Sequence, residues 1–195
     1  DTASFNFGNI RYEQPGTYAY TVKETGGDMP GVTNDTHVAN VTVEVKDNGN
    51  GQLEATATVT GGAFVNTYGA QPSDGVPEGM TFIKQLNGTA WPADRQFEFT
   101  LTGEGNAPMP QGAKDGKLNV TVGKPAGNGG TQTFDFGKIV YDAEGVYKYT
   151  VTEVKGDMPG VTYDGRTATV TVTVTDDKAG KLVAKAEVTG GVFTN

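Results

Sequence analysis

The 195-residue sequence contains one long stretch twice, without a gap. Residues 2–66 reappear as residues 131–195, at a constant offset of 129 residues, and more than half of the paired positions are identical. The identical pairs include Tyr18/Tyr147, Tyr20/Tyr149, Glu24/Glu153, Phe64/Phe193 and Asn66/Asn195. Because solenoid units repeat every ~20–50 residues, a period this long indicates a tandem array of whole domains.

Residues 80–130 occur only once, between the two copies. Nothing upstream of residue 1 corresponds to them, so we expect a window on a longer array, in which residues 1–68 are the C-terminal half of a module. Residues 69–79 contain two prolines and three glycines, a composition that predicts a linker. Residues 80–195 then form one complete module.

Short alternating strands are expected throughout the complete module. Apolar residues recur at every second position, as in Phe97, Phe99 and Leu101, with polar residues between them. This period is that of half-buried strands. Strands are predicted over residues 81–86, 96–102, 118–122, 146–153, 168–174, 181–188 and 192–195. We therefore predict an all-β chain of tandem immunoglobulin-like antiparallel β-sandwich modules.

Charge and composition exclude several classes of function. The formal net charge of -8 and the absence of cysteine argue against nucleic acid, an anionic membrane surface, a disulfide framework and a thiolate metal site. We expect no membrane insertion in this segment. His37 is the only histidine, so no Ser-His-Asp or Cys-His constellation can be built. We expect no metal, no cofactor and no turnover enzyme.

Three polar residues fall on apolar strand faces of the complete module. Lys84, Glu153 and Asn195 each lie two positions from apolar residues of their predicted strands. An unpaired polar group in a dry core costs several kcal/mol, so we expect the three side chains to contact one another. In the first copy, Glu24 and Asn66 have the same register.

The three side chains together predict a specific reaction. Burial disfavours the charged forms of Lys84 and Glu153, so both can be neutral. A neutral amine is a nucleophile, and a protonated carboxyl can polarise the Asn195 side-chain carbonyl. Attack at Cγ would release ammonia and leave an amide bond between lysine and asparagine. A buried polar network without a covalent bond is the alternative.

Four short motifs carry a resemblance to a known family. They are Phe-Ile-Lys-Gln-Leu-Asn-Gly from Phe82, Tyr-Lys-Tyr-Thr-Val-Thr-Glu ending at Glu153, Gly-Val-Thr-Tyr-Asp ending at Asp164, and Val-Phe-Thr-Asn ending at Asn195. Together they resemble the Gram-positive pilin isopeptide-linkage domain, a streptococcal pilin-type immunoglobulin-like surface repeat. The resemblance covers Met80 to Asn195 as a whole module and Asp1 to Tyr68 as a partial one.

The resemblance implies a role for each residue that matches. Lys84 is the amine, Asn195 the acceptor and Glu153 the catalytic acid of isopeptide formation. Glu24 and Asn66 match in the partial module, but the family's lysine strand is missing there, and the two lysines of that copy lack the Phe-x-Lys context. For this second pair we favour a polar contact without a covalent bond.

The function that this implies is structural. We expect a stalk module of an adhesin or pilus, extracellular and anchored to the wall of a Gram-positive bacterium. Its partners would be neighbouring modules, another copy completing the half-module, and a possible host ligand. The alternative is a binding module that recognises a host protein or glycan through the loops at residues 103–117 and 123–130. Trp91 is expected to pack at the rim rather than to stack on a ligand.

Overall fold

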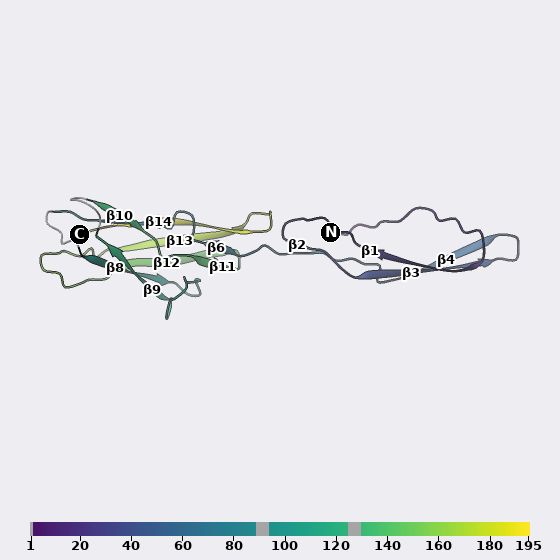
Figure 1. The fold of residues 1–195 in the computed structure, drawn as a ribbon, viewed down its shortest axis with the longest axis horizontal. Coiled ribbons are helices and arrows are strands. Elements are labelled where there is room, and N and C mark those ends of the chain that lie inside the picture. Colours follow the sequence, from purple (N-terminus) through teal and green to yellow (C-terminus); the bar gives the residue numbers. More distant parts are fainter. Residues whose placement is uncertain (1, 89–93, 125–129) are drawn as a thin grey trace. The chain divides into compact units, whose positions relative to one another are not determined.

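The computed structural model describes residues 2–88, 94–124 and 130–195, which form strands, turns and loops without a helix (Figure 1). The predicted all-β class is confirmed. The chain divides into two compact units, residues 1–69 (unit 1) and residues 70–195 (unit 2). No helix long and apolar enough to cross a bilayer occurs in the part of the chain that the structure describes.

A five-stranded antiparallel sheet forms most of unit 2. Its strands, in spatial order, are β14 (Leu182–Thr189), β13 (Thr167–Asp176), β12 (Gly145–Glu153), β8 (Gln96–Gly103) and β9 (Lys117–Gly123). Threonine and valine alternate along β13, and Val170, Val172 and Val174 are buried while the threonines between them are less buried. The period-two pattern therefore sets which face of the sheet meets the core.

A second sheet of unit 2 joins the two ends of the predicted module. It contains β10 (Thr131–Phe134), β7 (Phe82–Gln85) and β15 (Val192–Thr194), in that order. β10 and β7 are antiparallel, whereas β7 and β15 run parallel, with Val192 opposite Ile83. Asn195 extends this pairing, because its N–H donates to the Gln85 carbonyl at 3.1 Å. The first and last strands of residues 80–195 are thus direct neighbours.

The segment expected as a linker takes part in the structure of unit 2. Ser73–Gly75 (β6) pairs with Ile139–Tyr141 (β11) in a two-stranded sheet, and Gln71 bridges to Lys181. Sequence patterning predicts neither strand, because both are three residues long and one lies among prolines and glycines. Backbone hydrogen bonds therefore hold this stretch to unit 2 from Gln71 onward.

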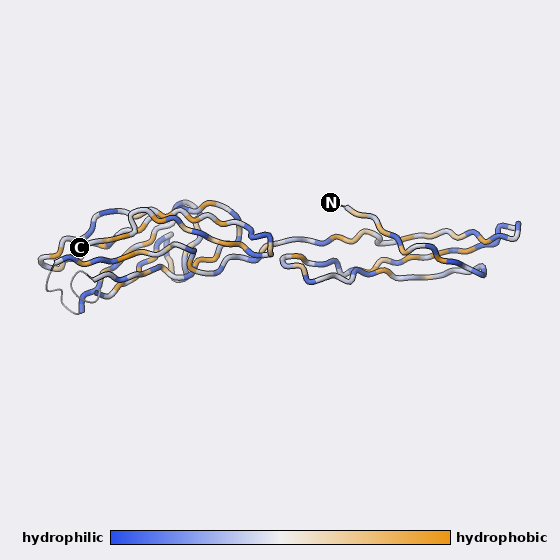
Figure 2. The backbone as a smooth tube through the Cα atoms, turned by 90° about the horizontal axis from the view of Figure 1, so that it is seen from above, coloured by the Kyte–Doolittle hydropathy of each residue, from blue (hydrophilic) through white to orange (hydrophobic). Residues whose placement is uncertain are grey.

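The core of unit 2 contains side chains from both of the larger sheets. Phe82 and Phe193 from the small sheet cluster with Phe99 from the large one, and the ring centroids of Phe99 and Phe193 lie 5.1 Å apart. Hydrophobic positions are interspersed with hydrophilic ones along the chain (Figure 2). Burial of each such ring contributes about 1.5–3 kcal/mol, so this cluster is a large part of what positions the strands.

Unit 1 has counterparts of only some of the strands that the second copy forms. β1 (Gly16–Lys23), β3 (Val38–Asp47) and β4 (Leu53–Thr60) form an antiparallel sheet, and β2 (Val32–Thr33) pairs with β5 (Thr67–Tyr68). β1, β3 and β4 correspond through the repeat to β12, β13 and β14, and β2 corresponds to the segment around Val161. The counterparts of β10, β11 and β15, which are residues 2–5, 10–12 and 63–65, form no strand.

One apolar face of unit 1 is far more exposed than its counterpart in unit 2. Tyr20 is 37% exposed whereas Tyr149 is 1% exposed, and Phe7 is 72% exposed whereas Phe136 is 4% exposed. In unit 2, residues 80–130 contribute β7, β8 and β9 to the same core. The difference follows from the absence of an equivalent segment among the described residues of unit 1.

Candidate crosslinking site

Lys84 is a lysine that β7 buries in the core. Its strand places Phe82 and Lys84 on the same inward face, and the lysine is 0% exposed. Its Nζ lies 2.8 Å from Glu153 Oε1 and 4.4 Å from the centroid of the Phe97 ring. Burial lowers the pKa of Lys84, and the hydrogen bond to Glu153 partly opposes that shift. The site therefore favours the neutral, nucleophilic amine more than water does.

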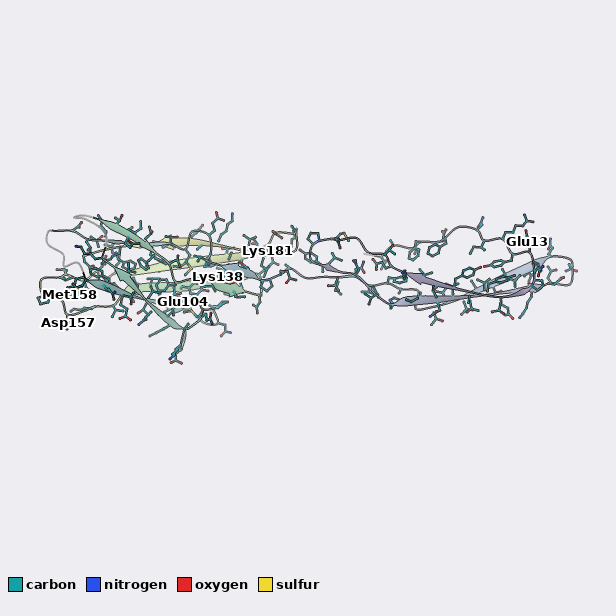
Figure 3. All side chains as sticks on the ribbon, in the orientation of Figure 1. Glu13, Glu104, Lys138, Asp157, Met158 and Lys181 are labelled. Carbon is teal, nitrogen blue, oxygen red and sulfur yellow. The ribbon has the colours of Figure 1, made fainter. Side chains whose placement is uncertain are left out.

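Glu153 ends β12 and lies between the lysine and the asparagine. Its Oε1 accepts hydrogen bonds from Lys84 Nζ and from Asn195 Nδ2, both at 2.8 Å. Its Oε2 accepts the backbone N–H of Asp164 at 2.9 Å. Among the described residues, Lys84 and Glu153 are the buried charged ones. The charged side chains labelled in Figure 3, such as Glu104 and Lys138, are instead exposed to solvent.

Asn195 follows β15, and its side-chain amide is held at both ends. Nδ2 donates to Glu153 Oε1, and Oδ1 accepts the Asp164 backbone N–H at 3.1 Å. We expected the Glu153 carboxyl to contact the asparagine carbonyl. The geometry differs, because a backbone donor already occupies Oδ1 and Glu153 faces the amide nitrogen. Glu153 thus lies beside the atom that would leave as ammonia.

The side chains of Lys84 and Asn195 meet because β7 and β15 are parallel neighbours. Lys84 Nζ and Asn195 Nδ2 donate to the same carboxylate oxygen, so the amine lies next to the amide. The arrangement places a buried nucleophile, a proton carrier and a carbonyl with a hydrogen-bond donor in one cluster, which are the parts of an acyl-transfer site. Sequence reasoning gave Asp164 only as part of a turn motif and missed its contacts.

Unit 1 repeats the acceptor half of this cluster. Asn66 Nδ2 donates to Glu24 Oε1 at 2.7 Å, and the backbone N–H of Asp35 donates to Asn66 Oδ1 at 2.8 Å. Glu24 Oε2 is buried and, among the described residues, has no hydrogen-bond partner. The structure therefore brings Glu24 and Asn66 together, and their contact in this chain is polar.

The remaining candidates contribute little to a site. His37 bonds to Asp35, with Nδ1 at 2.6 Å from Oδ1, and stacks on Phe64. The loop at residues 103–117 packs Met109 and Ala107 against the core. No cluster able to hold a metal ion occurs among the described residues. Trp91, and residues 125–129 of the second loop, lie outside them.

Comparisons with known proteins agree with the motifs. The family of Spy0128-like isopeptide containing domains (FctA) matches residues 1–69 and 80–195. Solved structures similar to this chain include two major pilins of Streptococcus pyogenes. The T3.2 pilin is 19% identical, with a TM-score of 0.31, over 94% of this chain and 69% of that one. The T-13 pilin is 23% identical, with a TM-score of 0.28, over 97% and 70%. No curated protein matches.

Proposed function

This chain belongs to the family of Spy0128-like isopeptide containing domains, and we propose that it is a structural shaft module of a Gram-positive pilus or surface adhesin. The module is braced by a bond that it forms itself, between Lys84 Nζ and Asn195 Cγ. The observation that carries the proposal is the buried cluster in which Lys84 and Asn195 donate to one oxygen of Glu153.

The reaction exchanges one amide for another. Glu153 takes a proton from the Lys84 ammonium, which leaves a neutral amine and a carboxylic acid. Nζ attacks Asn195 Cγ, and the Cγ–Nδ2 bond then breaks. Glu153 delivers its proton to the leaving nitrogen and receives one from Nζ, so ammonia departs and an amide remains. The chain is both reactant and product, so the reaction happens once and is not turnover.

Positioning supplies much of the acceleration in this mechanism. The fold holds the amine, the carboxyl and the amide within hydrogen-bond distance, which replaces a collision between separate molecules. The apolar ring of Phe97 beside Nζ keeps water away and strengthens the interactions of the reacting charges. Because both effects require the folded state, the bond forms after folding.

The bond would change how the module carries tension. β7 and β15 are the first and last strands of residues 80–195, and they are neighbours. A pull on both ends of the module loads a covalent bond instead of backbone hydrogen bonds. This chain contains no cysteine. The bond would stabilise the module covalently, as disulfides stabilise many extracellular proteins.

Single-molecule stretching tests the mechanical role. With the bond in place, residues between Lys84 and Asn195 cannot extend, and the wild-type chain lengthens only by unfolding unit 1. Glu153→Ala should lack the bond and release on the order of 400 Å of additional chain, at ~3.6 Å per residue. Equal extension of the two proteins would contradict the proposal.

The domain boundaries follow from the same proposal. Residues 80–195 form a complete module, and residues 1–68 are the C-terminal half of another. Residues 69–79 connect the two and pair with strands of the complete module from Gln71 onward. The Glu24–Asn66 pair is completed by a lysine-bearing segment of the type of residues 80–130, from adjoining chain or from a second copy. The exposed apolar face of unit 1 supports this.

The proposed setting is the outer surface of the cell wall, and the proposed partners are neighbouring modules of the same protein. A binding role for the loops has less support. The loop at residues 103–117 contains no aromatic residue, and aromatic side chains are the commonest anchors of protein interfaces.

A further inference from the structure

We infer that Asp164 is a positioning residue of the crosslinking reaction. Its carboxylate holds the strand that carries Asn195, and its backbone N–H stabilises the negative charge that develops on Asn195 Oδ1. The inference rests on the proposed function and adds a fourth residue to the three that the sequence motifs supply.

The carboxylate of Asp164 holds the closing strand at the residue before Asn195. Its Oδ2 accepts the backbone N–H of Thr194 at 2.8 Å, and its side chain is 6% exposed. The N–H of Asn195 itself donates to Gln85 on β7. Since successive N–H groups of a strand point to opposite edges, β7 and Asp164 hold β15 from its two sides.

Arg166 supports this contact. Its backbone N–H and its Nε donate to the Asp164 carboxylate at 3.0 and 2.9 Å, and its Nη1 donates to the Val192 carbonyl at 2.9 Å. Burial opposes the charged form of Asp164, but hydrogen bonds from Thr194 and Arg166 outweigh it and lower the pKa of the carboxyl. Asp164 is therefore a charged acceptor at neutral pH, and its hydrogen bonds are correspondingly strong.

The backbone N–H of Asp164 points at the oxygen where charge develops. It lies 3.1 Å from Asn195 Oδ1 and 2.9 Å from Glu153 Oε2. When Lys84 attacks Cγ, Oδ1 becomes an oxyanion, and a donor already aimed at it stabilises that charge without rearrangement. The same N–H also fixes the free oxygen of Glu153, which leaves Oε1 for the proton transfers.

Unit 1 repeats the two contacts that the asparagine strand receives, without a lysine at the site. The Asp35 carboxylate accepts the N–H of Val65, the residue before Asn66, at 2.8 Å, and the Asp35 N–H donates to Asn66 Oδ1 at 2.8 Å. The geometry around the asparagine therefore does not depend on contact with the amine. The acceptor half of the site is formed in advance, which is the condition for rapid attack once a lysine is seated.

The test measures the rate at which the bond forms in the full chain. The protein is recovered unfolded in denaturant, and dilution into buffer starts folding. Intact mass measured on acid-quenched samples gives the fraction that has lost ammonia, and circular dichroism gives the fraction folded. Asp164→Ala, Asp164→Asn and the control Asp135→Ala are compared with wild type. Asp135 accepts the N–H of Gly137 at 2.8 Å in a similar two-residue turn, without touching the closing strand.

We expect wild type and Asp135→Ala to react at the same rate. Folded Asp164→Ala should react about a hundredfold more slowly, because a displacement of ~1 Å at a reacting group has an effect of that size. Asp164→Asn retains one acceptor oxygen and should be intermediate. A rate for folded Asp164→Ala within threefold of wild type overturns the inference. If that variant does not fold, a wild-type rate for Asp164→Asn overturns it. A wild-type chain that folds and never loses ammonia refutes the crosslink itself.

Discussion

Replacing Glu153 with alanine removes the only carboxylate that contacts the Lys84 amine in the part of the chain that the structure describes. Nζ then remains between Phe97 and Phe99, at 4.4 and 5.8 Å from their ring centroids. Breaking a buried ion pair from one side costs about 3–5 kcal/mol. Burial already lowers the pKa of Lys84. The unpaired lysine can therefore lose its proton, which keeps the destabilisation of the variant from exceeding that of a broken ion pair.

The same substitution should also prevent the proposed crosslink. A covalent bond between Lys84 and Asn195 closes a loop of more than a hundred residues, and loops of that length restrict the unfolded chain by about 5 kcal/mol. The two effects together lower the free energy of unfolding by about 8–10 kcal/mol, most of the stability of an ordinary domain. Glu153→Ala should therefore fold only marginally and stay at full mass.

A double variant separates the two effects. Lys84→Met with Glu153→Leu cannot form the bond but leaves no buried charge, so it should lose about 5 kcal/mol only. At roughly 4 °C per kcal/mol for a domain of this size, calorimetry of the full chain should place its unit 2 transition about 12–20 °C above that of Glu153→Ala. If unit 2 melts at the same temperature in both variants, Glu153→Ala is not destabilised by an unpaired buried lysine and the reasoning is wrong.

Three further results follow from the structure. Phe99→Ala should lower the free energy of unfolding of unit 2 by about 3–5 kcal/mol in denaturant titrations, because its buried ring contacts the aromatic cluster; a loss below 1 kcal/mol would contradict the packing. Raising the pH should loosen unit 1. The Gly61 carbonyl and the Asp35 carboxylate raise the pKa of His37. The stabilisation that the protonated His37 ring gains from these two groups is therefore fully present below pH ~6.5, and it is lost as pH rises through the higher folded-state pKa. Hydrogen exchange should report the loss of protection in unit 1 as the pH rises, and His37→Arg should abolish this pH dependence. A peptide with the sequence of residues 79–88 should form a covalent adduct at Asn66 in low yield, since it supplies the lysine but little of the missing core; mass mapping that finds no adduct would count against a competent acceptor site.

Strand parity predicts much of the crosslinking site. Lys84 and Glu153 lie in strands whose apolar residues alternate strictly, so their inward direction follows from the period of two, and both are buried. The long repeat gives the equivalent pair in unit 1, and the unpartnered apolar face there follows from comparing the copies. The same alternation predicts the all-β class.

Hydrogen bonds made by backbone groups could not be predicted from the sequence. The donor to Asn195 Oδ1 is the N–H of Asp164, and every residue except proline has such a group, so residue type does not mark it. The orientation of the asparagine amide depends on that donor and was therefore predicted differently. β6 was missed because three residues among prolines and glycines carry no periodic signal.

The intact mass of the purified, folded chain tests the central claim most directly. A bond between Lys84 and Asn195 expels one ammonia, so the mass should lie about 17 Da below that calculated from the sequence. Tryptic digestion should then give one branched peptide that joins the two residues. A chain at full mass, with Lys84 and Asn195 recovered in separate peptides, would contradict the account.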